Sequence, residues 1–140
     1  MPPATPEQIA AYEKALYVVF GKPELVLRIG EPNPDLDELL SAEGASTAAF
    51  VTAANPRGVP GTAWQNEIAN AALVQTQTAA GYRCFEGEGR DPQKRWTPER
   101  SALLVGISQA AAEVVGRAFG QNAIVFVETG RAPKLVVLDA

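Results

Sequence analysis

The sequence predicts a single α+β domain over residues 1–140, with helices packed against one mixed β-sheet that ends in a C-terminal β-hairpin. Two patterns predict this class. Apolar residues at three- and four-residue spacing alternate along the chain with short runs rich in Val, Ile, Leu and Phe, which are typical of helices and strands respectively. Some of these strands come singly and others in pairs, which favours a mixed sheet over a purely parallel, doubly wound one.

The first half of the chain is expected to contain three helices with two strands between them. Thr5 and Gln8 are spaced as a capping box, so the first helix begins there, and its apolar stripe runs toward the break at Gly21. The β-prone residues 17–20 leave open an earlier change from helix to strand. The elements expected next are a strand over 25–29, a short helix after the N-cap residue Asn33 that ends at Gly44, a buried strand over 47–53, a breaker-rich loop over 54–61 and the longest helix, from Thr62 to Ala80.

The second half is expected to return to the sheet four times and to contain one further helix. Ser108 is placed as the N-cap of this helix, and the pattern before the stop at Gly120 predicts a buried face that includes Val115. The apolar positions of that face are 111, 114, 115, 118 and 119. The expected strands cover 82–85, 102–107, 123–128 and 134–138, with a charged loop over 87–98 and a closing hairpin between the last two strands.

The composition argues against several classes of protein. There are 12 Lys and Arg against 16 Asp and Glu, and no basic cluster stands out, so nucleic acid is not expected as a partner. No apolar window is long enough to span a membrane and no secretory signal begins the chain, so we expect a cytoplasmic protein without a membrane partner. Because the chain has no histidine and a single cysteine, Cys84, we expect no disulfide, no metal site and no cofactor.

Three motifs stand out by their residue types: Ala49 to Pro56 (AFVTAANP), Gly87-Glu88-Gly89 before Trp96, and Gly116 to Val125 (GRAFGQNAIV). The third is the most specific, because a corner between a helix and a strand does not require an Arg, a Phe-Gly stop and a Gln-Asn pair at this spacing. Together they resemble a bacterial family known as domain of unknown function 3293, mainly over residues 48–127. The resemblance implies a bacterial cytoplasmic domain and assigns no functional residue.

Two loops contain charged or conformationally special residues. The loop from Asn55 to Gly61 joins a buried strand to a helix N-terminus, where free backbone N–H groups and Arg57 can hold an anion. A rigid turn is the simpler interpretation of its Pro and Gly residues. Glu88 and Asp91 could act as a carboxylate pair, although solvated loop charges that pair locally are the simpler interpretation here as well.

A second group of polar residues lies on two of the expected helices. Arg117, Gln121 and Asn122 can converge beside the end of the sheet, or can simply cap their helix. Asn66 and Asn70 share a helix face that is expected to meet solvent. If that face is buried, the pair forms a hydrogen-bond network or contacts a ligand. We therefore predict one polar ligand site formed by Asn55, Arg57, Asn66, Arg117, Gln121 and Asn122.

Three functions stay open. The first is a binding module for a small polar or anionic ligand, or for a protein partner, without chemistry. The second is a histidine-free enzyme that uses Glu88 or Asp91 as its base and Arg57 or Arg117 for electrostatic stabilisation. The third is a subunit that only associates, through the acidic N-terminal third or the edge of the terminal hairpin. The absence of histidine and of a strong motif favours binding or association.

Overall fold

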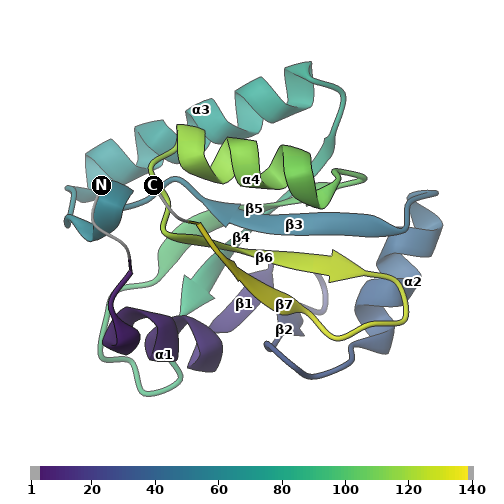
Figure 1. The fold of residues 1–140 in the computed structure, drawn as a ribbon. Coiled ribbons are helices and arrows are strands. Elements are labelled where there is room, and N and C mark those ends of the chain that lie inside the picture. The colour runs from purple at the N-terminus through teal and green to yellow at the C-terminus, as the bar shows by residue number, and fades with distance from the viewer. Residues whose placement is uncertain (1–3, 139–140) are drawn as a thin grey trace.

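The computed structural model describes residues 4–138, except for the side chain of Arg57, and within them shows one seven-stranded sheet. The strands are ordered β2-β1-β4-β5-β3-β6-β7 (Figure 1). Their bounds are β1 (Leu16–Val19), β2 (Leu25–Leu27), β3 (Thr47–Thr52), β4 (Arg83–Arg90), β5 (Glu99–Val105), β6 (Ala123–Glu128) and β7 (Lys134–Val137). The α+β class and the C-terminal hairpin are thus confirmed.

The sheet differs from the prediction in the direction of its strands. All six neighbouring pairs are antiparallel, so the sheet is not mixed. The interior strand β3 lies between β5 and β6, with which it is not consecutive in sequence. Local sequence determines that a segment is extended, but it does not determine the direction in which such distant strands meet.

The four α-helices begin where their capping residues predict. They are α1 (Pro6–Lys14), α2 (Pro34–Ala42), α3 (Ala63–Ala79) and α4 (Gln109–Ala118), and their N-caps are Thr5, Asn33, Thr62 and Ser108. In each case the cap side chain accepts a hydrogen bond from the backbone N–H three residues later, which satisfies one of the free donors of the first turn. Within the described residues, no helix is long and apolar enough to cross a bilayer.

Thr62→Ala is expected to lower the free energy of unfolding by about 1 kcal/mol, because the backbone N–H of Gln65 loses its acceptor at 3.0 Å. Urea denaturation measures the change. Thr62→Ser keeps the hydroxyl and is expected to stay within about 0.5 kcal/mol of the wild type. Equal midpoints for all three proteins would contradict the role of this cap.

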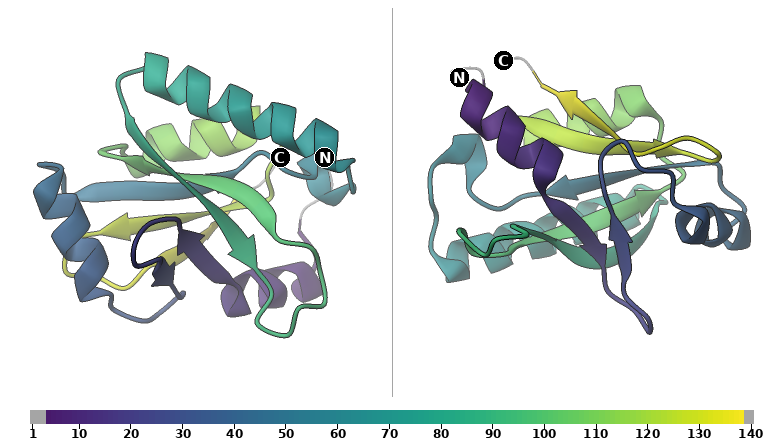
Figure 2. Two further views of the ribbon diagram at one scale, coloured as in Figure 1. Left: turned by 180° about the vertical axis from the view of Figure 1, so that it is seen from behind. Right: turned by 90° about the horizontal axis from the view of Figure 1, so that it is seen from below.

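Helices cover the two faces of the sheet differently. On one face, α3 and α4 lie side by side over the central strands (Figures 1 and 2) and bury a core that includes Leu73, Leu104 and Ile124. On the other face, the strongly twisted sheet curves around a second core, into which α2 inserts Leu36 and Leu40. Helix α1 lies away from α2, next to β7. The second face is therefore filled with apolar side chains toward α2. Toward α1 it is lined by both aromatic and polar side chains.

Several boundaries and faces differ from the predictions. Strand β4 continues through residues 87–90, which were expected to form a loop, because they pair with β1. The chain changes from helix to strand at Ala15, so the early change that the sequence left open does occur. On α4 the sheet is met by Ala112 and Gly116, while Val114 is 65% exposed. The close approach of this helix to the sheet requires small residues at the interface, which turns the larger Val114 outward.

The asparagine face of α3 is not exposed to solvent as expected. Asn70 is 3% exposed, whereas Trp64 is 73% exposed and Ile68 is 52% exposed. The apolar residues on this helix are too few to determine which side is buried, and Leu73 and Asn70 face the sheet together. The prediction of solvent exposure for Asn66 and Asn70 was therefore wrong, and Asn66 takes part in a network described below.

Candidate functional site

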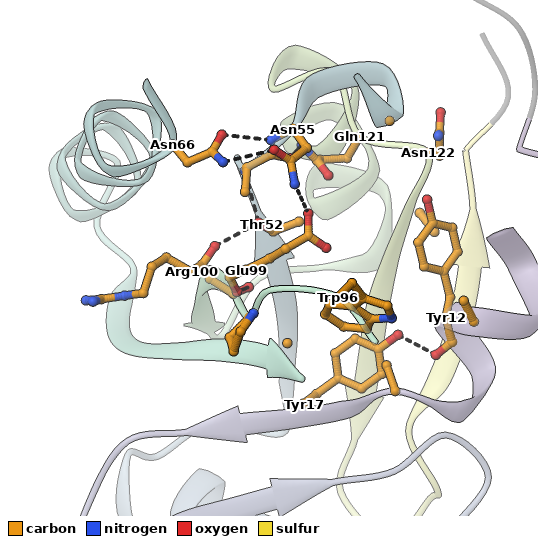
Figure 3. A pocket seen from close by; sticks show the side chains of 18 of the residues that line it. Tyr12, Tyr17, Thr52, Asn55, Asn66, Trp96, Glu99, Arg100, Gln121 and Asn122 are labelled. Carbon is orange, nitrogen blue, oxygen red and sulfur yellow. Dashed lines mark hydrogen bonds between the residues drawn. The ribbon is translucent and has the colours of Figure 1, made fainter. Parts of the chain in front are cut away.

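A cavity of about 1090 Å³ opens at the α1 end of the curved face (Figure 3). Its size is that of pockets that bind small organic molecules. One part of its wall is aromatic and comes from α1, β1, β3 and the loop before β5, with the side chains of Tyr12, Tyr17, Phe50 and Trp96. The other part is polar, with Asn55, Asn66, Glu99, Gln121 and Asn122.

The antiparallel sheet explains why these polar residues meet. The end of β3 lies beside the start of β5, since Thr52 pairs with Ser101. It also lies beside the start of β6, because β3 and β6 run antiparallel with Phe50 opposite Val125. Residues that follow β3, begin β5 or precede β6 are consequently brought to one corner of the sheet.

Asn55 organises this corner through its backbone and its side chain. It adopts the left-handed conformation, with φ 48° and ψ 58°, which asparagine tolerates better than most residues. Its backbone N–H donates to Asn66 Oδ1 at 2.9 Å, and its own Oδ1 accepts from Asn66 Nδ2 and from the Gly61 N–H, both at 2.9 Å. Its Nδ2 donates to Glu99 Oε2 at 2.8 Å. The loop after β3 is thereby fixed to α3 and to β5.

Glu99 is the half-buried carboxylate of the cavity. Burial raises its pKa, and the hydrogen bond from Asn55 offsets only part of that increase. No cationic group among the described side chains lies within ion-pair distance of it. The adjacent Arg100 directs its guanidinium away from Glu99 (Figure 3), toward Glu86 at 3.2 Å and Glu67 at 3.8 Å.

Two buried amides on the segment between α4 and β6 also line the cavity. Gln121 is 7% exposed, and its Nε2 donates to the carbonyls of Ala54 and Phe119, both at 3.1 Å. Asn122 is 6% exposed, and within the described part of the chain its side chain makes no hydrogen bond. Its amide oxygen and nitrogen are not enclosed by protein, and they are accessible from the cavity.

Four of the six predicted site residues lie together in this wall, namely Asn55, Asn66, Gln121 and Asn122. Arg117 does not line the cavity and lies 3.5 Å from Glu113 on α4. The backbone of Arg57 belongs to the short 3-10 helix Pro56–Gly58 beside the cavity, and its side chain lies outside the described part of the structure.

The carboxylates proposed as a catalytic base do not line the cavity. Glu88 Oε2 accepts from Arg90 at 2.6 Å. Asp91 Oδ2 accepts from the Arg95 guanidinium at 3.0 Å, and the Asp91 carboxylate also accepts from the backbone N–H groups of Gln93 and Arg95. These bonds hold the pKa of Asp91 below its usual range. Nowhere in residues 4–138 do three or more carboxylate or thiol side chains gather in a way that could hold a metal ion.

Sequence reasoning missed Glu99 and the aromatic wall. Glu99 lies between the predicted loop over 87–98 and the predicted strand over 102–107 and was assigned to neither, because the apolar run of β5 begins only at Ala102. A usable signal was the two-residue alternation that places Glu99, Ser101 and Leu103 on one face of the strand. Trp96, for which both a packing and a pocket role are compatible with the sequence, lines the cavity and also packs against the second core.

One comparison with known proteins gives a result. A family model described as "Protein of unknown function (DUF3293)" matches residues 51–124, just over half of the chain. The matched range contains the whole polar wall of the cavity and Trp96, but not Tyr12 or Tyr17. No curated protein and no solved structure shows significant similarity to the chain.

Proposed function

Because this chain belongs to the family of proteins of unknown function DUF3293, we propose its function from the cavity itself: it is a binding module that holds a small polar organic molecule. We further propose that it works in the bacterial cytoplasm, since its single cysteine suits a reducing compartment. The family description adds no activity to this proposal.

The observation that carries the proposal is the unpartnered amide of Asn122. Most side-chain polar groups of largely buried residues bond to protein or to ordered water. Asn122 is 94% buried as a residue and directly precedes β6, and its amide is open only to the cavity, where water or a ligand can bond it. A ligand with a donor or acceptor at this position would supply the missing partner. The aromatic wall opposite supplies apolar area for the rest of such a molecule.

The binding test is a thermal-shift screen of small polar molecules on the wild type and on Asn122→Leu, which has a similar volume without the amide. A ligand at about 100 times its dissociation constant is expected to raise the melting temperature of the wild type by roughly 5–10 °C. The shift is expected to shrink to less than about half in Asn122→Leu. Gln75→Leu makes the same chemical change at an exposed position of α3 and is expected to keep the full shift.

The outcome that contradicts the proposal is equally specific. A shift that stays the same in Asn122→Leu would place the ligand outside the cavity. The unliganded Asn122→Leu protein is expected to melt within about two degrees of the wild type, because the amide makes no hydrogen bond to a described residue and the change therefore breaks none. A loss of ligand binding in a folded variant can therefore be assigned to the site.

A histidine-free enzyme is the second candidate, and one observation favours it. The raised pKa of Glu99 suits a general acid or base that must exchange a proton inside a cavity. Cys84 does not line the cavity, and burial raises the pKa of its thiol, so this cysteine is not an activated nucleophile. Chemical conversion of a screened ligand by the wild type, abolished in Glu99→Gln, would establish this candidate in place of simple binding.

A further inference from the structure

We propose that the ligand is an organic cation with a flat apolar body, and that its amidinium, guanidinium or ammonium group pairs with Glu99. This inference rests on the proposed binding function and adds the chemical class of the ligand. Its charge is opposite to that of the anion which the sequence allowed, as the alternative to a rigid turn, at the loop around Asn55.

The first argument is the unbalanced charge of Glu99. The one hydrogen bond that its carboxylate accepts from a described residue comes from the neutral amide of Asn55, at 2.8 Å. A carboxylate that is partly removed from water loses solvation, and a neighbouring cation compensates for that loss better than a neutral donor. Arg100 lines the same cavity, but its guanidinium is already engaged by Glu86 and Glu67. A cationic ligand group would supply the charge that the described side chains leave unbalanced.

The second argument is the aromatic wall beside this carboxylate. Figure 3 shows Trp96 and Tyr17 below Glu99 and Tyr12 to its right. The Tyr17 hydroxyl donates to the Tyr12 carbonyl, and burial raises the pKa of Tyr17, so this ring stays neutral. Faces of Trp and Tyr attract cations, and the attraction grows when water is excluded. A carboxylate next to such rings favours a cation with an attached planar group.

The third argument is that an anion would meet repulsion in this cavity. Glu99 lines it without a cationic partner among the described side chains, whereas Glu67 lines it paired with Arg100 at 3.8 Å. Two like charges several ångströms apart repel by about 1 kcal/mol or more in a partly buried site, so an anionic ligand would bind more weakly while Glu99 is ionised. Asn122 and Gln121 line the same cavity and can contact a neutral polar group of the same ligand.

The test compares three probes that share one ring and differ in charge: benzamidinium, benzamide and benzoate. The protein carries Trp64→Phe, which removes the exposed tryptophan of α3 and leaves Trp96 in the cavity as the fluorescent reporter. Benzamidinium is expected to give a saturable change in Trp96 fluorescence with a dissociation constant of about 1 mM or lower. It is expected to bind at least about tenfold more tightly than benzamide or benzoate.

Glu99→Gln in the same background keeps an acceptor for Asn55 and removes the charge. Its affinity for benzamidinium is expected to fall about tenfold, to the level of benzamide. Without ligand it is expected to melt no lower than the parent at pH 7. A buried carboxyl with a raised pKa contributes stability at low pH that is lost as the pH rises through that pKa, so the ionised group does not stabilise the fold at pH 7.

The pH dependence gives a second readout. Benzamidinium affinity is expected to fall as the pH drops toward the pKa of Glu99, which lies above the ordinary 4.5. The other titratable groups that line the cavity are Tyr12, Tyr17, Glu67 and Arg100. Any effect of these groups persists in Glu99→Gln, so the difference between the two pH profiles belongs to Glu99.

Three results would overturn the inference. They are equal binding of benzamide or benzoate, unchanged benzamidinium binding in Glu99→Gln, and no saturable signal up to about 10 mM benzamidinium. A further result separates this inference from the proposed binding function. If a screened ligand no longer binds Asn122→Leu but binds Glu99→Gln as tightly as the wild type, the binding function holds and the inference of a cationic ligand is wrong.

Discussion

Gly87→Ala is expected to destabilise the fold by more than about 3 kcal/mol, because it inserts a methyl group where two strands touch. A Cβ at Gly87 would lie 2.0 Å from the carbonyl oxygen of Val18 and 3.2 Å from the Cα of Val19. These atoms belong to the backbone of β1, which pairs with β4 at this position, so no side-chain rotation can relieve the overlap. Urea denaturation followed by circular dichroism measures the loss.

Gly89→Ala is the matched control for this prediction. Gly89 lies two residues along the same strand, and the nearest atom to its added Cβ would be Trp96 Cη2 at 4.0 Å. This is an ordinary van der Waals distance. Because alanine also restricts the unfolded chain, the change is expected to leave stability within about 1 kcal/mol of the wild type or to raise it. Similar losses for both variants would show that close packing of β1 on Gly87 does not explain the first result.

Gly87 also illustrates what the sequence does not reveal. The pattern Gly-Glu-Gly within a charged stretch predicts a loop, because glycine and charged residues are poor strand formers. The structure needs glycine there for the approach of β1, and this requirement comes from a neighbour almost 70 positions earlier in the chain. The N-caps Thr5, Asn33, Thr62 and Ser108, in contrast, act within three residues, and the sequence predicts all of them.

In the candidate site, too, the features that depend on neighbouring residues were predicted and those that depend on distant strands were not. Asn55, Gln121 and Asn122 were grouped correctly because each occupies a corner between a strand and a helix, and antiparallel neighbours bring such corners together. Glu99 was missed because its place in the cavity depends on β5 pairing with β3. Arg117 was included because it is close in sequence to Gln121, but the rotation of α4 places it away from the cavity. Spacing along the chain identifies corners more reliably than it identifies the direction of a side chain.

Asn55→Ala is expected to lower the free energy of unfolding by about 2–4 kcal/mol. The change removes the acceptor of the Gly61 N–H and of Asn66 Nδ2, and it also removes the donor to Glu99. Alanine must in addition adopt the left-handed conformation that asparagine tolerates, with φ 48°. Urea denaturation gives the total effect.

Two further substitutions separate these contributions. Asn55→Gly loses the same hydrogen bonds but adopts a positive φ at no steric cost, so it is expected to be about 1 kcal/mol more stable than Asn55→Ala. Asn55→Asp keeps an oxygen that can accept from both Gly61 and Asn66 but places a second carboxylate against Glu99. Two such carboxylates raise each other's pKa, so this variant is expected to be less stable than the wild type at pH 7 and to recover as the pH falls and the pair takes up a proton. A stability deficit of Asn55→Asp that does not change between pH 7 and about pH 5 would show that Asn55 does not act on Glu99 through this bond.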